Sequence, residues 1–412
     1  MRIVIVCDPG RVDGGAAKIA IAGARGLADA GVAVHYVCTS GPPSADLTHP
    51  NIQVHCLNMP SVWTVSNPVA AAVQGIWNGR ARQEFENILR QIPREDMVVH
   101  FHQWTKSFSP SVLSVPARLG IPSIAYVHDY FLACPNGAYY RFADATPCTL
   151  VPMSGACLTT RCDSRSSLHK VVRVARQVTT NKVLEQAGAF LSLVSNSTFG
   201  ERVVDDFISR QHRRFVVPYP VVVAQEEPVA VAQNKRFVFL GRMTAEKGVR
   251  QLAAAARQTG LPVTFVGEGP LLEEIKAQPG PIHCAGWQDS AGVNRILREA
   301  RALVFPSTWY ETGGLVVLEA LGRGIPVLAS RETGAADFVV EGENGFLIER
   351  DDGRSLRAGM MKLADEAIAE RMGHEAYQRY WANPQSEAVH ARNLIRVYQT
   401  LLSELKLRAD TA

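Results

Sequence analysis

The sequence predicts an α/β protein with two doubly wound domains, each a parallel sheet with helices on both faces. Short apolar runs bounded by turn residues alternate with stretches of helical spacing along the 412 residues. Such runs between helices are typical of strands that are buried on both faces of a parallel sheet. The alternation occurs on either side of a segment with several prolines and no helical periodicity, so we expect two separate sheets.

The first domain is predicted to contain five strands. They are residues 2–7, 33–38, 97–102, 122–128 and 189–195, and segments such as 16–29 and 81–91 have helical spacing. The first strand is too short for the core of a signal peptide, and no apolar run reaches the roughly 18 residues of a membrane span. We therefore expect a cytoplasmic protein and leave open its contact with the inner face of a membrane.

The second domain is predicted to contain six strands. They are residues 236–240, 262–266, 282–285, 302–305, 327–329 and 346–348. Gly241, Gly267, Gly286 and Pro306 each follow one of these strands. Ligands of open parallel sheets bind at the carboxyl ends of the strands, so these positions predict the edge of a cleft.

The domain boundaries follow from a connecting segment and a final helix. Residues 216–234 contain three prolines, and we place the first domain at 1–218 and the second at 219–386. Residues 387–412 have apolar residues at helical spacing and are predicted to form a helix that packs back on the first domain.

The overall charge of the chain excludes few classes of ligand or partner. Lys and Arg number 43 and Asp and Glu 39, a balance of +4 that gives no reason to expect nucleic acid as a partner. An anionic ligand must therefore be held by a local site.

The first glycine-rich loop, residues 8–18, has neither the G-x-G-x-x-G pattern of dinucleotide folds nor a P-loop. The second strand also ends without the acidic residue that binds the ribose of NAD. These absences disfavour an NAD-dependent oxidoreductase. Gly14 and Gly15 allow the backbone to approach an anion, although a tight turn alone would explain them.

Basic and glycine residues follow the strands of the second domain. Arg242 offers a planar fork and Lys247 a point charge, a pair that suits a diphosphate, although basic loop residues are often only solvated. Glu268, next to Gly267, and Trp287, next to Gly286, lie where a flat base would fit, and Trp287 would stack on it or fill the core.

The pair Glu311 and Glu319 is the motif that points most specifically to a bound ligand. Seven residues separate them, and Gly313 and Gly314 lead into the helix that carries Glu319. A helical step of eight residues spans about 12 Å, comparable to the distance from the ribose to the sugar of a nucleotide-sugar. The amides of residues 313–316 would hold the phosphates.

In this order the motifs resemble the retaining glycosyltransferases of family four, which have the GT-B architecture of two Rossmann-like domains facing a central cleft. The resemblance covers nearly the whole chain. It rests on Gly14-Gly15-Ala16, Tyr126-Val127-His128-Asp129-Tyr130, Ser195-Asn196-Ser197, Gly241-Arg242 with Glu246-Lys247-Gly248, Gly267-Glu268-Gly269-Pro270, Gly286-Trp287, Glu311 with Glu319, and Gly342-Glu343-Asn344-Gly345.

The resemblance implies transfer of a sugar from a UDP- or GDP-linked donor to a hydroxyl of a glycan or lipid-linked acceptor, in polysaccharide or glycolipid biosynthesis. The implied catalytic residues are His128, Arg242, Lys247 and Glu311. The implied donor-binding residues are Gly15, Gly241, Glu268, Gly286, Trp287, Gly313, Gly314, Leu315, Val316 and Glu319. The departing diphosphate takes the acceptor's proton, so no separate base is expected, and the absence of a D-x-D motif fits a site without a catalytic metal.

Two further groups are assigned to the acceptor side. His102 and Asp129 are expected acceptor contacts. Cys134, Cys148, Cys157 and Cys162 fall within a loop-like stretch and suit a structural zinc ion, with unligated buried cysteines as the alternative.

Residues 62–91 contain Trp63 and Trp77 followed by several arginines. This pattern suits a helix that touches a membrane or a lipid-linked acceptor, although core packing with a solvated face is the more common explanation.

Two other function classes stay open on the sequence alone, an NAD-dependent oxidoreductase and a non-catalytic scaffold that binds a sugar nucleotide.

Overall fold

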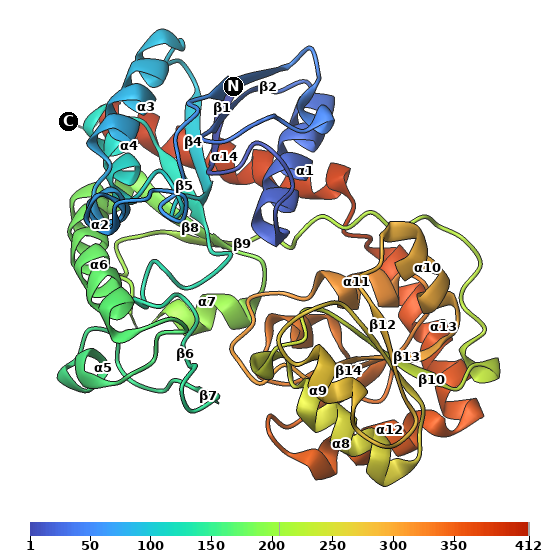
Figure 1. The fold of residues 1–412 in the computed structure, drawn as a ribbon. Coiled ribbons are helices and arrows are strands. Elements are labelled where there is room, and N and C mark those ends of the chain that lie inside the picture. Colours follow the sequence, from blue (N-terminus) through green and yellow to red (C-terminus); the bar gives the residue numbers. More distant parts are fainter. Residues whose placement is uncertain (206, 411–412) are drawn as a thin grey trace.

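The structure, a computed structural model, describes residues 1–205 and 207–410 and contains two parallel-sheet domains (Figure 1). The first sheet has the order β3-β2-β1-β4-β5-β8-β9, and every neighbouring pair is parallel. Its strands are β1 Arg2–Cys7, β2 Ala33–Cys38, β3 Ile52–Cys56, β4 Met97–Gln103, β5 Ser123–Tyr126, β8 Leu191–Ser195 and β9 Arg214–Val216.

Helices cover both faces of this sheet. The helices of this domain are α1 Gly15–Asp29, α2 Pro68–Ile76, α3 Gly79–Gln91, α4 Ser114–Arg118, α5 Gly155–Thr159, α6 Ser167–Ala187 and α7 Thr198–Asp205. Phe85 and Leu89 of α3 pack on one face, and Leu27 of α1 packs on the other. A small antiparallel pair, β6 Tyr140–Arg141 and β7 Thr146–Pro147, lies in the loop before α5.

The second sheet has the order β12-β11-β10-β13-β14-β15 and is also parallel. Its strands are β10 Arg236–Leu240, β11 Val263–Val266, β12 Ile282–Gly286, β13 Ala300–Phe305, β14 Val327–Ser330 and β15 Gly345–Ile348. Its helices are α8 Val249–Thr259, α9 Leu272–Lys276, α10 Ser290–Arg298, α11 Leu315–Leu321, α12 Gly353–Ala364 and α13 Glu366–Ala382. Because β10 and β13 are neighbours, the loops that follow them lie side by side.

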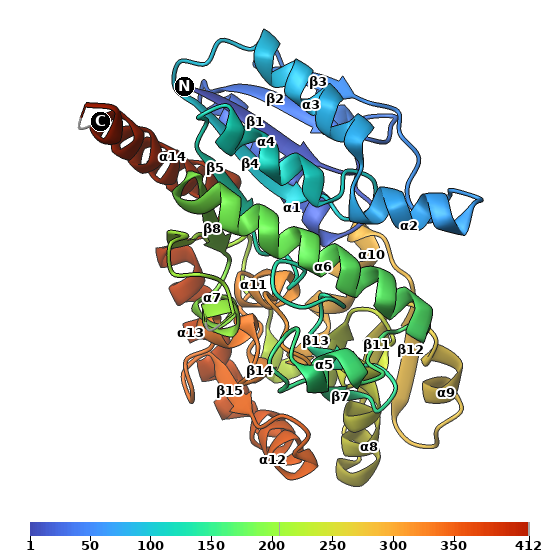
Figure 2. The same cartoon turned by 90° about the vertical axis from the view of Figure 1, so that its left-hand side faces the viewer.

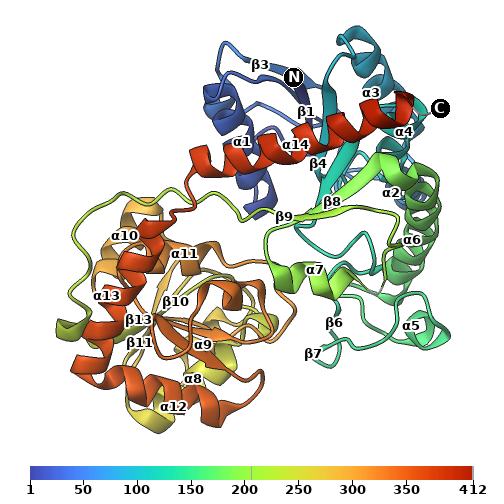
Figure 3. The same cartoon turned by 180° about the vertical axis from the view of Figure 1, so that it is seen from behind.

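The last helix, α14 Glu387–Asp410, leaves the second domain and lies along the first (Figure 3). Leu394, Val397 and Tyr398 of α14 are buried in the same apolar cluster as Leu27 of α1. The helix therefore completes the core of a domain whose other elements end near residue 216.

The predicted α/β class with two doubly wound parallel sheets is confirmed, and eleven of the thirteen strands in those sheets fall at predicted positions. The prediction missed β3, which stands at the edge of its sheet and has apolar side chains only at alternate positions, Ile52, Val54 and Cys56. It also missed β9, which has three residues. A strand at the sheet edge needs only one apolar face, so it lacks the continuous apolar run of a central strand.

None of the described helices combines the length and the apolar character that a bilayer crossing requires.

Candidate active site between the two sheets

The candidate site lies where the carboxyl ends of the two sheets face each other. The second domain contributes the loops after β10 and β13, and the first domain contributes His128 after β5 and Ser197 after β8. The Ser197 hydroxyl donates to the Thr312 carbonyl at 2.7 Å, and the Thr312 hydroxyl donates to the His128 carbonyl at 3.0 Å. The loop that carries Glu311 is therefore bonded directly to the first domain.

Lys247 and Glu311 form an ion pair at the centre of the site. Lys247 Nζ lies 2.5 Å from Glu311 Oε1, and the two side chains are only 13% and 16% exposed. Gly248 has a positive φ of 72°, and a Cβ there would lie 2.0 Å from the Pro306 carbonyl oxygen. Only glycine permits this close approach of the two loops, and the approach places Lys247 beside Glu311.

Glu311 has further partners on its second oxygen. Oε2 accepts hydrogen bonds from Ser307 Oγ at 2.7 Å and from Trp309 Nε1 at 3.3 Å. A carboxylate has about four acceptor positions, and three are occupied by these two groups and Lys247. The carboxylate is thus fixed in orientation and keeps room for about one more donor, such as a sugar hydroxyl.

Arg242 lies at the rim of the site and is not in contact with Lys247 and Glu311. Its side chain is 72% exposed, and its guanidinium is 3.8 Å from Glu246. Glu319, on α11, is 21% exposed and lies 3.7 Å from Lys18 of α1. This ion pair is a second link between the domains, at the ribose end of the predicted donor site.

The two glycines before α11 are tightly packed, Gly314 against Ala335 of its own domain and Gly313 against Asn196 of the first domain. A Cβ at Gly313 would lie 2.0 Å from Asn196 Nδ2 and 2.9 Å from the Tyr219 ring. Leu315 and Val316 follow as the first residues of α11. By contrast, a Cβ at Gly15, the first residue of α1, would meet no atom within 4 Å, so open space lies next to Gly15.

His128 is held on both ring nitrogens. Nε2 lies 2.8 Å from His102 Nδ1, and Nδ1 lies 2.9 Å from the Tyr219 hydroxyl. Removal from water lowers the pKa of His128 to about 3, so the ring is neutral at pH 7. Both side-chain nitrogens are occupied, which leaves the backbone carbonyl as the group of His128 with acceptor capacity to spare.

The structure changes the role expected of His102. Its side chain is 4% exposed and lies behind His128, where burial holds its pKa well below the usual range. It therefore positions His128, whereas an acceptor contact would need to face the cleft. His100 shares its face of β4, as predicted, and is bonded through Nδ1 to the Tyr398 hydroxyl of α14 at 2.7 Å.

Asp129 follows His128 and lines a separate groove in the first domain. Its Oδ1 accepts the Phe131 amide at 3.0 Å. Burial raises the pKa of Asp129 to about 6, with the nearby Arg176 acting in the opposite direction.

The end of the donor site that is predicted to bind the nucleotide base is open to solvent. Trp287 is 68% exposed, and Glu268 is also exposed. The Gly267 amide donates to the Gly286 carbonyl at 2.8 Å, and the Gly241 amide donates to the Val266 carbonyl at 3.0 Å. The loops after β10, β11 and β12 thus lie side by side, with an exposed tryptophan ring available for stacking.

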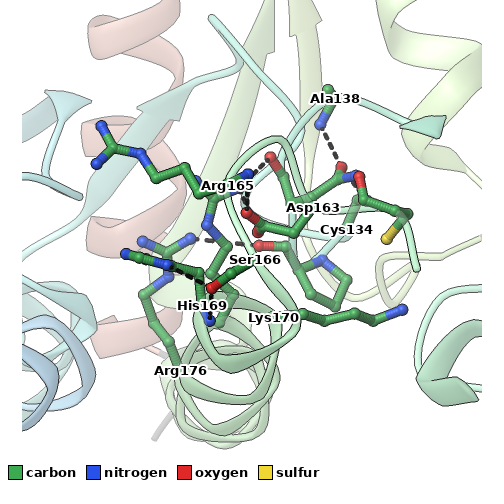
Figure 4. Close-up of polar contacts among 12 residues, drawn as sticks. Cys134, Ala138, Asp163, Arg165, Ser166, His169, Lys170 and Arg176 are labelled. Carbon is green, nitrogen blue, oxygen red and sulfur yellow. Dashed lines mark hydrogen bonds and ion pairs between the residues drawn. The ribbon is translucent and has the colours of Figure 1, made fainter. Parts of the chain in front are cut away.

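Cys134 lies near the loop that precedes α6 (Figure 4), and all four clustered cysteines are free thiols. Cys134 contacts Asn136 Oδ1 at 3.1 Å, and burial raises the pKa of its thiol to about 11. Among the residues that the structure describes, no three His, Cys, Asp or Glu side chains are arranged to hold a metal ion. The geometry therefore gives the predicted zinc site no support, and we derive no step from it.

Several residues of the site have no signal in the sequence pattern. Tyr219 lies in the segment predicted as a connection, yet its hydroxyl bonds His128. Ser307 and Trp309 are close to Glu311 in the sequence, but only the fold makes them its hydrogen-bond partners. Arg176 lies in the middle of α6, and nothing in its local sequence indicates its position beside Asp129.

Family models match both domains. The model described as Glycosyltransferase Family 4 matches residues 13–150, and the model described as Glycosyl transferases group 1 matches residues 234–366.

Curated relatives match over part of their length. The D-rhamnosyltransferase WbpZ of Pseudomonas aeruginosa is 33% identical over 152 residues, which are 35% of this chain and 40% of the relative. The capsular polysaccharide biosynthesis glycosyltransferase CapM of Staphylococcus aureus is 37% identical over 195 residues, which are 43% of this chain and 50% of the relative. The matches span half or less of the length of these two relatives.

Solved structures share the fold over nearly the whole chain. Sucrose-phosphate synthase of Thermosynechococcus elongatus superimposes with a TM-score of 0.69 at 18% identity, over 98% of this chain and 99% of that one. HepE of Anabaena, solved with UDP and glucose, gives 0.64 at 15% identity, over 97% of this chain and 100% of that one. The two sheets have the GT-B arrangement, and with the family models matched in order on both domains, the chain belongs to the glycosyltransferases of family four.

Proposed function

We propose that the chain is a retaining glycosyltransferase that moves a sugar from a UDP- or GDP-linked donor to a hydroxyl of a glycan or lipid-linked acceptor. The observation that carries the proposal is the fixed Lys247–Glu311 pair, which faces the first domain through the loop bonded to His128. A cation held in place suits a diphosphate, and a carboxylate with one acceptor position left suits a sugar hydroxyl.

The names of the relatives support the substrate class. WbpZ is a D-rhamnosyltransferase, CapM acts in capsular polysaccharide biosynthesis, and HepE was solved with UDP and glucose. We therefore place this chain in polysaccharide or glycolipid biosynthesis and take UDP as the first donor carrier to test.

Retention requires that the acceptor hydroxyl attacks from the face that the diphosphate leaves. The bond from the anomeric carbon to the diphosphate oxygen breaks, and the bond to the acceptor oxygen forms. The proton of the acceptor hydroxyl passes to the departing phosphate oxygen, so no side chain has to act as a base. The protein's task is to stabilise the charge that grows on the leaving group.

Each site residue has a role in this scheme. Lys247 lies closest to the departing diphosphate, Arg242 reaches it from the rim, and the amides of residues 313–316 supply further donors. Glu311 accepts a hydroxyl of the sugar, and Glu319 accepts the ribose hydroxyls. The His128 carbonyl has one acceptor position left beside its bond from Thr312 and faces the positive charge at the anomeric carbon.

The proposed reaction uses no catalytic metal. Arg242 and Lys247 supply the diphosphate with the positive charge that a metal ion would otherwise supply.

A thermal-shift screen of the purified full chain tests the donor side of the proposal. The ligands are UDP, GDP and ADP, their sugar derivatives, and NAD as the ligand of the alternative oxidoreductase. We expect one uridine or guanosine diphosphate to raise the melting temperature, because a ligand that binds only the native state stabilises it. A shift with NAD alone would overturn the proposal.

Product analysis separates an enzyme from a scaffold. The nucleotide-sugar found in the screen is incubated with the protein, and release of the free nucleoside diphosphate is measured, with the anomeric configuration of the product read by NMR. Slow hydrolysis with retention is expected even without an acceptor. Tight binding with no release in the presence or absence of membrane lipid extract would favour the scaffold.

A further inference from the structure

A second hollow, separate from the donor site, lies in the first domain between α2 and α6. Its volume is about 490 Å³, and we call it the α2–α6 groove. Figure 2 shows α2 beside the longer α6 on the outer side of the domain. The residues that carry its chemistry are Trp63, Ala72, Asp129, Val172, Arg173 and Arg176.

The groove runs from the solvent-exposed start of α6 inward to Asp129. Leu168, His169, Val172, Arg173 and Arg176 line it from successive turns of α6. Leu168 at one end is 72% exposed, whereas Arg176, about 12 Å further along the helix, is 9% exposed. Asp129 lines the same groove and directly follows His128.

At the inner end of the α2–α6 groove, Arg176 is a buried cation that no carboxylate contacts. Among the described residues it forms no ion pair within 4 Å, and its contacts are the Pro135 carbonyl at 3.4 Å and the Phe131 ring at 4.4 Å. Desolvation lowers the pKa of Arg176 to about 10, so it is still charged at pH 7. Asp129 and Asp163 act on Arg176 only from beyond ion-pair distance. Burial of a charge with no carboxylate in contact is costly, and a bound anion would supply that contact.

A second arginine stands one turn away. Arg173 is paired with Asp163 at 3.1 Å and donates to the Asn136 carbonyl at 3.3 Å. In Figure 4, the Lys170 side chain extends away from Arg176. Asp163 and Asp129 together balance the formal charge of these two arginines, and Lys106, which lines the same groove, is paired with Asp13. An anion would therefore be held by direct contact with Arg176, which forms no ion pair within 4 Å among the described residues, and not by a net charge of the groove.

The walls of the groove are apolar. None of the residues of α2 is buried, although its sequence PVAAAVQGI contains a single polar side chain. Pro68, Ala71 and Ala72 of α2 line the groove, as do Leu168 and Val172 of α6. Val69 and Val73 of α2 lie beside a separate hollow and are 72% and 60% exposed. A surface helix of this composition is unusual in water and is typical of a contact with hydrocarbon.

The mouth of the groove carries aromatic and basic groups together. Trp63 is 48% exposed and contacts the His169 ring, with centroids 6.2 Å apart. The Arg165 guanidinium lies 3.8 Å from the centre of the Trp63 ring. A tryptophan beside a cation is typical of the boundary between hydrocarbon and phosphate headgroups.

From this arrangement we propose that the α2–α6 groove binds the acceptor as a lipid phosphate, with the hydrocarbon chain between α2 and α6 and the phosphate or diphosphate on Arg176 and Arg173. The hydroxyl that receives the sugar then lies beside Asp129, toward His128. This inference rests on the proposed function and selects a lipid-linked acceptor over a free glycan.

Farnesyl diphosphate is a suitable probe, because it combines a short hydrocarbon chain with the anionic group. Binding to the full chain is measured by isothermal titration calorimetry and by the fluorescence of tryptophan, since Trp63 stands at the mouth. Farnesol and inorganic diphosphate test the chain and the anion separately. We expect both to bind at least about tenfold more weakly than farnesyl diphosphate, because each lacks one of the two contacts.

Three variants test the residues. Arg176→Met and Arg173→Gln should weaken farnesyl diphosphate at least about tenfold without changing the weak binding of farnesol. Ala72→Trp should fill the groove and weaken both ligands. Arg80→Gln, an exposed arginine of neighbouring α3, is the matched control and should bind like the wild type.

The outcomes separate this inference from the donor proposal. Nucleotide affinity, measured in parallel, should be the same in all four variants. If the wild type binds a nucleotide but prefers inorganic diphosphate or a water-soluble oligosaccharide to farnesyl diphosphate, the groove proposal is wrong and the proposed function stands. Should Arg176→Met fail to fold, Arg173→Gln and Ala72→Trp still decide, and wild-type affinity in both would overturn the assignment.

Discussion

The Nζ atom of Lys247 lies 2.5 Å from Oε1 of Glu311, and this contact joins the loops that follow β10 and β13. Each residue therefore fixes the other, and both are held in place before any ligand arrives. Preorganised charge of this kind stabilises a leaving group without reorganisation during the reaction.

Replacing Lys247 by Met should abolish most of the sugar transfer. Loss of one preorganised donor to a developing negative charge typically lowers kcat by about 100-fold to 1,000-fold, and we expect a loss of that size. The measurement is turnover with a saturating donor, after circular dichroism has shown that the variant is folded. Lys276→Met, which removes an exposed lysine paired with Glu273 on α9, is the control and should keep its activity. Turnover near the wild-type rate in a folded Lys247→Met protein would remove Lys247 from the mechanism.

Substitutions of Glu319 and of its partner Lys18 distinguish an effect on donor binding from an effect on the contact between the domains. Glu319→Gln should raise the donor KM about tenfold, because the ribose hydroxyls lose a charged acceptor. Lys18→Met removes only the ion pair of 3.7 Å, in which Lys18 is 55% exposed, and an exposed pair is worth at most about 1 kcal/mol. We therefore expect its donor KM to stay within about fivefold of the wild type. Equal effects of the two substitutions in steady-state kinetics would contradict the ribose assignment.

Alanine at two glycines should have opposite consequences for stability. A Cβ at Gly313 would lie 2.0 Å from Asn196 Nδ2, so Gly313→Ala should destabilise the protein by about 1–3 kcal/mol in urea unfolding. At Gly15 a Cβ meets no atom within 4 Å, and Gly15→Ala should leave stability unchanged or slightly higher.

Donor affinity completes the test of these two glycines. If a phosphate lies against Gly15 in the complex, Gly15→Ala should weaken nucleotide binding in a fully stable protein. Unchanged nucleotide affinity in that variant would show that the loop after β1 stays away from the donor.

His390 of α14 should make folding sensitive to acid. Its Nδ1 donates to the Pro218 carbonyl at 2.8 Å, and desolvation lowers its pKa to about 4. The pKa of His390 is lower in the folded protein than in the unfolded chain, where it is about 6.5. The folded protein is therefore most favoured above about pH 6.5, and this stability is lost as the pH falls toward 4. His390→Gln keeps a donor for Pro218 but does not titrate. Between pH 7.5 and 4.5 the variant should therefore lose about 2 kcal/mol less unfolding free energy than the wild type.

Urea titrations at several pH values measure this difference, and comparison of the two proteins cancels the other buried groups. His100, His102 and His128 also have depressed pKa values and act in the same direction, whereas Asp129, with a raised pKa, acts in the opposite one. Parallel stability curves for wild type and His390→Gln would show that His390 is already solvated.

The sequence predicted the parallel strands because they have local signals, and the donor residues were assigned from local signals as well. Strands such as β1 and β10 are continuous apolar runs, and Gly313 with Glu319 stands at a strand-to-helix turn that is visible within ten residues. The Lys247–Glu311 contact spans 64 residues and follows only from β10 and β13 being neighbours in the sheet. Local periodicity does not report which strands are neighbours.

The contacts on the acceptor side depend on the fold for the same reason. His102 alternates with His100 on β4, and Tyr398 of α14 bonds His100 across 298 residues. Leu168, Val172 and Arg176 lie one turn apart and so share a face of α6. That α2 completes the groove depends on the packing of two helices about 90 residues apart in the chain.

The route of the chain between its domains has a mechanical consequence. It crosses once after β9 and again before α14, and the two crossings are bonded to each other where the Val221 amide donates to the Gln385 carbonyl at 2.7 Å. The two crossings join the domains at one place, so separation of the domains would stretch both connections. A cut in either crossing alone would leave the domains attached through the other.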